Sequence, residues 1–382
     1  MFSYLASELK SGDIAVAGSD SYANLHDQLM SWEECEPLVA EFCAEAGLPT
    51  NPRELTRHYR QLLADTAAEV DSGYPANPDL TLEGGRPMLK RRKGAERSKE
   101  ALKLEEAVHE RLPQRDKTVA ADGSQIETWE NNLLAESHIR YGGYGGLAYR
   151  HISNTYVALF SRFIPCGVWE AVHIIEGLLK NASEIQPDTI HADTQGQSLP
   201  VFGLAALMGF DLLPRIRNWH DLIFYRPTPG TPYQHIDSLF GDEAIDWTLI
   251  ETHWTDLLHT AISIRENRLS SVTLLRRLGN HSRKNRLYRA FRELGRAVRT
   301  ITLLRYLSDA DLREQITQVT NRNESFHNFA DGHPVDLDDL ATISPYITQV
   351  IRRFGNWILN LTPPAADPTT RLDLESQVLF AP

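Results

Sequence analysis

Two short segments of the chain share a pattern that limits what it can fold into. Residues 118–122 read TVAAD, and residues 189–193 read TIHAD. Each begins with two β-branched residues and ends in Ala-Asp, which is typical of a short buried strand that ends in an acid. A carboxylate placed where a strand leaves its sheet is held by rigid backbone. The chain is therefore expected to carry Asp122 and Asp193 at strand ends.

The residues between and after these segments predict alternating strands and helices. Residues 141–166 alternate glycines with β-forming residues and predict a hairpin, and residues 168–179 carry an apolar face at helical spacing. A helix from 198 to 208 and a short strand over 212–216 are expected next. The order β-β-β-α-β-α-β indicates an α/β (or α+β) fold with a mixed sheet flanked by helices.

Helices are predicted towards both ends of the chain. Residues 32–46 and 52–70 have helical patterns, whereas 72–89 is rich in glycine and proline and has the composition of a linker. Near the other end, Ser308 with an acid three residues later resembles a capping box, and the helix that starts there runs through Glu324.

Two strand-borne aspartates and one acid from a helix are the arrangement of a two-metal site for phosphoryl transfer. Carboxylate oxygens suit Mg²⁺, which is a hard cation. However, Asp122 is followed by Gly123, and Asp-Gly is a common turn signal. On the residue pattern alone, the turn interpretation is favoured over the metal interpretation.

Positive charge is concentrated in one segment of an acidic chain. The net charge is −12, yet residues 265–305 hold twelve Lys or Arg against two Glu. Such an asymmetry points to nucleic acid as a partner. Four arginines in this segment are spaced to share one helix face opposite an apolar stripe: Arg289, Arg292, Arg296 and Arg299. This face either contacts a phosphate backbone or is a solvated face paired with acids elsewhere, and the sequence leaves both interpretations open.

A few further positions are weaker candidates. Trp219 lies close to Arg215 and Arg217 and is the tryptophan that we would test for DNA contact, although tryptophans belong more often to the core. His191 shares a strand face with Asp193, and a role in the core is favoured over support of the site.

Several other protein classes lack their motifs in this chain. It has no GxxxxGK(S/T), GxSxG or HExxH pattern, and its GxGxx(G/A) match at residues 143–148 precedes strand-like residues. The three cysteines form no CxxC pair, and no apolar run approaches the ~20 residues of a membrane span. The N-terminus does not read as a signal peptide, so we expect a cytoplasmic protein without membrane contact.

Longer stretches carry a more specific resemblance. They are VAADGSQIETW, LLAESHIRYGGYGGLAYRHISNTYVALFSRFIPCGVWEAVHIIEGLL, IQPDTIHADTQGQSLPVFGLAALMGFDLLPRIRNW, RLSSVTLLRRL, NRLYRAFRELGRAVRTITLLRYLSD and ATISPYITQVIRRFG. Across residues 118–362 the chain thereby resembles the C-terminal catalytic part of Tn3-family transposases.

The resemblance implies an RNase H-like fold with a DDE triad that binds Mg²⁺, with Mn²⁺ as an alternative ion, and that cuts and joins DNA at transposon ends. Matched by motif, the triad is Asp122 in ADGSQ, Asp193 in HADTQG and Glu324 in TNRNESF. The basic arginines fall in the helical insertion that the family carries before its glutamate helix, here about residues 235–307. A homo-oligomer acting on DNA ends and target DNA, in the bacterial cytoplasm and at the nucleoid, is also implied.

Comparison with the family pattern predicts a helical N-terminal or linker region over 1–113 and the catalytic domain over 114–382. Family members are longer, with large N-terminal DNA-recognition domains, and have more residues before Lys117 and after Glu324. We therefore expect an N-terminally truncated and internally deleted member. The alternative function is that of an inactive transposase remnant that only binds DNA or another protein.

Overall fold

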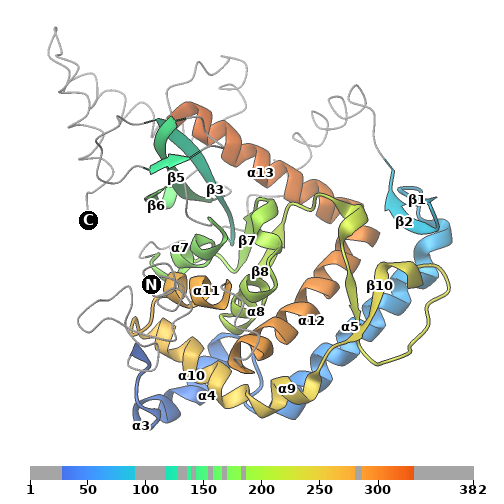
Figure 1. Cartoon of the computed structure of the whole chain (residues 1–382), viewed down its shortest axis with the longest axis horizontal. Coiled ribbons are helices and arrows are strands. Elements are labelled where there is room, and N and C mark those ends of the chain that lie inside the picture. The colour runs from blue at the N-terminus through green and yellow to red at the C-terminus, as the bar shows by residue number, and fades with distance from the viewer. Residues whose placement is uncertain are drawn as a thin grey trace, which may run out of the picture.

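A mixed β-sheet lies beside the helices, towards the upper left of Figure 1. The computed structural model describes residues 28–90, 117–127, 136–138, 143–153, 158–165, 170–181, 186–279 and 286–330. The six strands of the sheet are β3 (Thr118–Glu127), β4 (Glu136–His138), β5 (Gly143–Ser153), β6 (Ala158–Pro165), β7 (Thr189–Ala192) and β8 (Asp211–Pro214). β5 is antiparallel to β3 on one side and to β4 and β6 on the other, whereas β7 and β8 continue from β3 in parallel. The predicted mixed sheet flanked by helices is confirmed.

Most helices lie on one side of the sheet, and one long helix lies on the other (Figure 1). The α-helices are α3 (Trp32–Cys35), α4 (Val39–Glu45), α5 (Pro52–Gly73), α7 (Glu176–Leu179), α8 (Leu199–Leu207), α9 (Trp247–Thr252), α10 (Trp254–Arg265), α11 (Ser271–Gly279), α12 (Arg286–Ser308) and α13 (Ala310–Ala330). Short 3-10 turns are η2 (Glu36–Leu38), η3 (Tyr74–Ala76), η4 (Glu170–His173), η5 (Thr194–Gln197), η6 (Trp219–Asp221) and η7 (Asp237–Leu239). Within the described ranges, no helix combines the length and the apolar character needed to cross a bilayer.

The two faces of the sheet pack against different helices. Successive strand residues point to opposite faces. Val119 and Ala121 of β3 belong to the large core that also contains α8 and α12. On the other face, Leu213 of β8 packs with Leu312 and Ile316 of α13. The helix that carries Glu324 therefore covers one face of the sheet, and the main helical layer covers the other.

Two glycines let α8 and α12 cross at short distance. A Cβ atom on Gly295 of α12 would lie 1.9 Å from the carbonyl oxygen of Leu199, and one on Gly203 of α8 would lie 2.4 Å from the carbonyl oxygen of Phe291. Both obstacles are backbone atoms, so the helices would have to separate to admit a side chain. The close contact joins the helix that follows β7 to the longest helix of the main helical layer.

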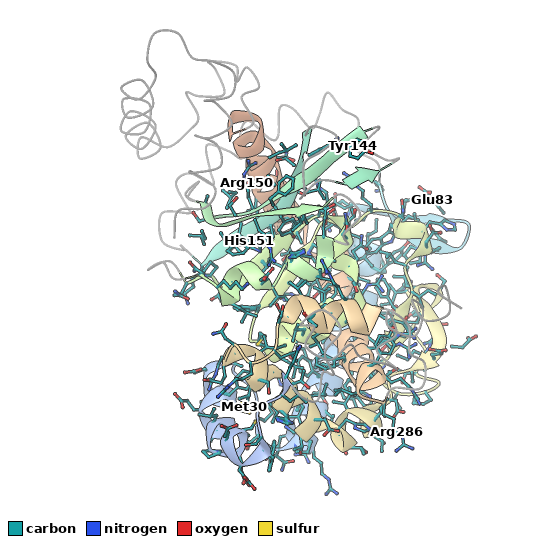
Figure 2. All side chains as sticks on the ribbon, turned by 60° about the vertical axis from the view of Figure 1, so that its left-hand side comes forward. Met30, Glu83, Tyr144, Arg150, His151 and Arg286 are labelled. Atoms are coloured by element: carbon teal, nitrogen blue, oxygen red, sulfur yellow. The ribbon has the colours of Figure 1, made fainter. Side chains whose placement is uncertain are left out.

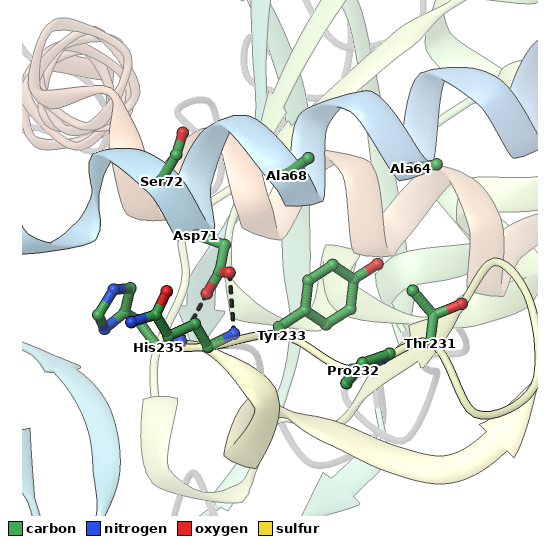
Figure 3. A pocket seen from close by; sticks show the side chains of 9 residues that line it. Ala64, Ala68, Asp71, Ser72, Thr231, Pro232, Tyr233 and His235 are labelled. Carbon is green, nitrogen blue, oxygen red and sulfur yellow. Dashed lines mark hydrogen bonds between the residues drawn. The ribbon is translucent and has the colours of Figure 1, made fainter.

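The N-terminal helices share this core. α5 packs along α12, and Leu55 and Leu63 of α5 are fully buried. Asp71, near the end of α5, accepts hydrogen bonds from the backbone N–H groups of Gln234, His235 and Ile236 at 2.6–3.1 Å. Figure 3 shows this carboxylate beside a surface hollow between α5 and the chain around Tyr233. The predicted domain boundary between residues 113 and 114 lies outside the described residues.

The predicted linker over 72–89 is wrong. These residues form η3 and a hairpin of β1 (Leu80–Glu83) and β2 (Arg86–Leu89). Gly84 and Gly85 have φ values of +57° and +80°, which is the left-handed geometry that a two-residue hairpin turn requires. A small parallel pair, β9 (Phe224–Arg226) with β10 (Phe240–Ala244), was also not predicted.

Three element boundaries also differ from the prediction. The first acid-ended strand does not stop at Gly123, because β3 continues to Glu127 alongside β5. The helix expected over 168–179 is divided, in its described part, into η4 and α7. The cap of α13 is Asp309, whose Oδ1 accepts the N–H of Leu312 at 3.0 Å, rather than Ser308, which ends α12.

Filling the helix crossing should destabilise the protein. Gly295→Ala forces a methyl group against the Leu199 carbonyl, so we expect a loss of about 1–3 kcal/mol in the free energy of unfolding, measured by chemical denaturation. Gly73→Ala at the end of α5 is the control, because nothing lies within 4 Å of its Cβ position. That variant should match the wild type or gain up to ~1 kcal/mol. Equal stability of the two variants would contradict the close crossing.

Candidate active site

Asp122 and Asp193 are neighbours across two parallel strands. β3 and β7 pair in register from Thr118 opposite Thr189 to Ala121 opposite Ala192. Asp122 and Asp193 are the next residue on each strand. Since paired strands lie about 4.8 Å apart, the two backbones bring these aspartates side by side. The prediction that both lie at strand ends holds for Asp193 and is wrong for Asp122, which is inside β3 at the point where pairing with β7 stops.

Backbone N–H groups hold one oxygen of each aspartate. Oδ1 of Asp122 accepts from the N–H of Gly123 at 2.9 Å. Oδ1 of Asp193 accepts from the N–H of Gln195 at 2.9 Å, and Asp193 is thereby the N-terminal cap of η5. The local chain therefore holds one oxygen of each carboxylate.

α13 packs across the two strands that carry the aspartates. It packs against β3 and β7, and its buried positions include Ile316 and Thr320. Asn321 accepts a hydrogen bond from Nη2 of Arg215 at 2.8 Å. Arg215 directly follows the last residue of β8, Pro214, which pairs with Ala192. Glu324 comes three residues after Asn321 on the same helix, and its side chain lies outside the described residues.

Arg150 is a site residue that the sequence analysis missed. It lies opposite Asp122 in the antiparallel register of β3 and β5, and directly opposed residues share a face of the sheet. Its side chain is 8% exposed, and its Nη1 donates to the Ser124 hydroxyl at 3.0 Å. Its neighbour His151, also labelled in Figure 2, points to the opposite face. A buried cation therefore sits beside Asp122, and only the pairing of the strands could have revealed it.

Glu170 was missed as well. Its carboxylate is buried in η4, and its Oε1 accepts from Nε2 of Gln195 at 2.7 Å. Its Oε2 lies 2.7 Å from where a Cβ atom of Gly123 would be. The sequence offered one signal, because Glu170 interrupts the otherwise apolar run VWEAV.

The buried side chain of Tyr149 lies close to three acids. Tyr149 of β5 is fully buried, and burial raises its pKa well above the usual value of 10.0. The charges of Asp193, Glu170 and Asp122 raise that pKa further. The three carboxylates therefore lie within electrostatic range of one side chain.

The segment that carries Glu170 is anchored by Glu176, the first residue of α7. The Glu176 carboxylate is buried and accepts hydrogen bonds from His173 at 2.8 Å, from Lys180 at 2.7 Å and from Arg162. Burial alone would raise the pKa of Glu176, but these hydrogen bonds and the charges of Arg162 and Lys180 lower it to about 2. Glu170 thus belongs to a rigid part of the fold.

His191 lies in the interior. It is fully buried in β7, and burial lowers its pKa to about 4, so the ring is uncharged at neutral pH. This supports the core role that the sequence analysis favoured.

The four predicted DNA-binding arginines of α12 do not share one solvated face. Arg289 is exposed and Arg292 is half-buried. Arg296 is 9% exposed, because α12 is packed by other elements on several sides. Burial lowers the pKa of Arg299, which is half-buried.

Arg296 is held by partners within the protein. Its Nη1 donates to Glu293 at 2.9 Å, its Nη2 donates to Glu243 at 2.6 Å, and its guanidinium lies 4.4 Å from the centre of the Tyr225 ring. The expectation of a shared outward face is therefore wrong at this position. DNA contact by the other three arginines stays a prediction.

The candidates around Trp219 also differ in exposure. Arg217 is exposed, and Arg215 is half-buried and bonded to Asn321. Trp219 is 9% exposed, donates its Nε1–H to the Pro87 carbonyl at 3.2 Å and stacks on Tyr306. The Trp219 side chain is therefore part of the core, and it is not available for base stacking.

The family model described as the Tn3 transposase DDE domain matches residues 109–332, which is more than half of the chain and includes Asp122, Asp193 and Glu324. The chain belongs to this family.

Curated relatives agree with this assignment. The transposase for transposon Tn1546 of Enterococcus faecium is 31% identical over 214 residues, which cover 56% of this chain and 22% of that protein. The transposase for transposon Tn501 of Pseudomonas aeruginosa is 33% identical over 192 residues, which cover 50% of this chain and 19% of that protein. The chain thus spans about a fifth of the length of these relatives.

Replacing Arg296 should lower the stability of the folded protein, because its guanidinium is paired inside the protein. Arg296→Met leaves the buried Glu293 carboxylate without its cation, so we expect a loss of about 3–5 kcal/mol in the free energy of unfolding. Arg289→Ala on the exposed side of α12 should change it by no more than about 0.5 kcal/mol. Denaturant titration of both variants compares them, and a stable Arg296→Met variant would contradict the internal role.

Proposed function

We propose that this chain is the catalytic region of a DDE transposase, which cleaves DNA strands at transposon ends and joins them to target DNA. The observation that carries the proposal is the neighbouring position of Asp122 and Asp193, one residue beyond the last β3–β7 pair. The match of this region to a transposase DDE domain and the names of the relatives support it.

The residues suit a divalent metal ion. Adjacent aspartates supply the hard oxygen donors that Mg²⁺ and Mn²⁺ prefer, and the backbone holds one oxygen of each in place. Among the described side chains no group of three His, Cys, Asp or Glu residues forms a ligand set, and the Glu324 side chain is not among them. We propose Asp122, Asp193 and Glu324 as the ligands, Mg²⁺ as the usual ion and Mn²⁺ as its substitute. When bound, such ions activate the attacking oxygen and stabilise the leaving oxygen.

The other residues of the site orient its parts. Arg150 places positive charge on the same sheet face as Asp122 and holds Ser124, which lies two residues further along β3 on that face. The Arg215–Asn321 hydrogen bond ties the end of β8 to α13 and so fixes the helix that carries Glu324. We propose that these contacts help to hold the acids in position before DNA binds.

DNA binding is proposed for the arginines that remain accessible. Arg217 and Arg289 are exposed and Arg292 is half-buried, which allows contact with phosphates. Arg215 is half-buried and bonded to Asn321, and Arg299 is also half-buried. Arg296 is bonded to Glu293 and Glu243, so we do not propose it as a DNA contact. We further propose that the protein acts as a homo-oligomer on transposon ends and target DNA in the bacterial cytoplasm, at the nucleoid.

Neutralising one aspartate should separate cleavage from binding. Asp193→Asn removes the charge that a metal ion needs and keeps the cap of η5, because the amide oxygen can still accept the Gln195 N–H. We expect strand cleavage of transposon-end DNA with Mg²⁺ or Mn²⁺ to be abolished, and DNA affinity to stay near the wild-type value. Gel assays of nicking and of binding measure the two.

The matched control is Asp188→Asn. Asp188 precedes the other end of β7, and its exposed carboxylate lies 3.5 Å from Lys117. This variant should cleave like the wild type. Equal loss of binding and cleavage in Asp193→Asn would contradict the proposed division of roles, and binding without cleavage by the wild type would favour an inactive remnant.

The accessible arginines predict a change in salt dependence. The double variant Arg289→Ala with Arg292→Ala should lower the slope of log affinity against log salt by about 0.9 for each phosphate that the protein no longer neutralises. Arg57→Ala, an exposed arginine on α5, is the control and should leave the slope unchanged. Binding titrations at several salt concentrations provide the slopes. An unchanged slope in the double variant would show that these arginines form a solvated face without phosphate contacts.

A further inference from the structure

Glu170 lies directly behind the aspartate pair. Gly123 follows Asp122, so its missing side chain would point to the face of the sheet opposite Asp122. Oε2 of Glu170 occupies that place, 2.7 Å from the Cβ position. The Glu170 carboxylate therefore contacts β3 on the face that α13 does not cover. It lies on the opposite face of the sheet from the Asp122 carboxylate.

A chain of hydrogen bonds connects Glu170 to Asp193. Oε1 of Glu170 accepts from the side-chain Nε2 of Gln195 at 2.7 Å, and the backbone N–H of Gln195 donates to Oδ1 of Asp193 at 2.9 Å. Gln195 thus has its side chain tied to Glu170 and its backbone tied to the aspartate. Because Glu170 is 7% exposed and η4 is followed by the anchored Glu176, this tether starts from a fixed point.

We propose that Glu170 is a positioning residue, which holds Gln195 and thereby sets the orientation of the Asp193 carboxylate for metal binding. The inference rests on the proposed metal-dependent function. Residues that orient metal ligands through hydrogen bonds typically contribute 10–100-fold in metal affinity. The hydrogen bond to Gln195 carries the effect, and the charge of Glu170 does not.

Four variants of the full chain separate these roles. Glu170→Ala and Gln195→Ala each break the tether from one side. Glu170→Gln keeps an oxygen that can accept from Gln195 and removes the charge. Gln197→Ala is the matched control, because it removes another glutamine side chain of η5, one that bonds to the Arg215 carbonyl at 3.4 Å.

The first measurement is binding of Mn²⁺ alone by calorimetry. Glu170→Ala and Gln195→Ala should each weaken binding about tenfold, and the double variant should be no weaker than either, because both remove the same link. Glu170→Gln and Gln197→Ala should bind like the wild type. Additive losses, no loss in the alanine variants, or a loss in Glu170→Gln equal to that in Glu170→Ala would overturn the proposal.

The second measurement needs no metal. Hydrogen exchange of the backbone N–H of Gln195 measures how often its hydrogen bond to Asp193 opens. The exchange should be several-fold faster in Glu170→Ala and unchanged in Glu170→Gln. Unchanged exchange in Glu170→Ala would overturn the positioning role. If the wild type does not bind Mn²⁺ through Asp193, the proposed function fails instead, and the exchange data still decide whether Glu170 positions Asp193.

Discussion

The parallel pairing of β3 with β7 is the constraint on which the candidate site depends. A shift of one residue would turn every side chain of one strand to the other face. The apolar residues prevent such a shift, because Val119 and Ala121 of β3 and Ile190 and Ala192 of β7 all belong to one buried core. Burial of four ordinary apolar side chains thus fixes where the two following aspartates lie.

The support of this register extends through most of the described chain. Asp193 leads through η5 into α8, α8 crosses α12 at Gly203 and Gly295, and α12 packs along α5. Cys35 and Leu55 near the N-terminus belong to the same hydrophobic core as Val119 of β3. The helices before the sheet and the helices between β8 and α13 therefore act together as one scaffold.

Local patterns in the sequence predicted the elements, and contacts between distant residues explain the differences. The hairpin of β5 and β6 and the helix α5 follow from short-range periodicity, so they were predictable. The continuation of β3 past Gly123 was not predictable, because a glycine at that point of the sequence indicates the end of a strand. In the structure, the missing side chain of Gly123 leaves room for Glu170. Arg296 was assigned to the surface by spacing alone, and its partner Glu243 lies 53 residues away in the sequence. The positions of Asp122 and Asp193 were inferred from strand patterns, but their adjacency required the register.

The electrostatics of the sheet edge favour a bound cation. Two carboxylates at neighbouring strand positions repel each other, and the repulsion is strongest where burial excludes water. The N–H groups of Gly123 and Gln195 offset part of it, and Arg150 places a positive charge opposite Asp122 on the same face. Glu170 lies on the opposite face, where its carboxylate accepts the hydrogen bond from Gln195. A divalent ion between the aspartates would neutralise both at once, so the fold holds these carboxylates in an arrangement that a metal ion would stabilise.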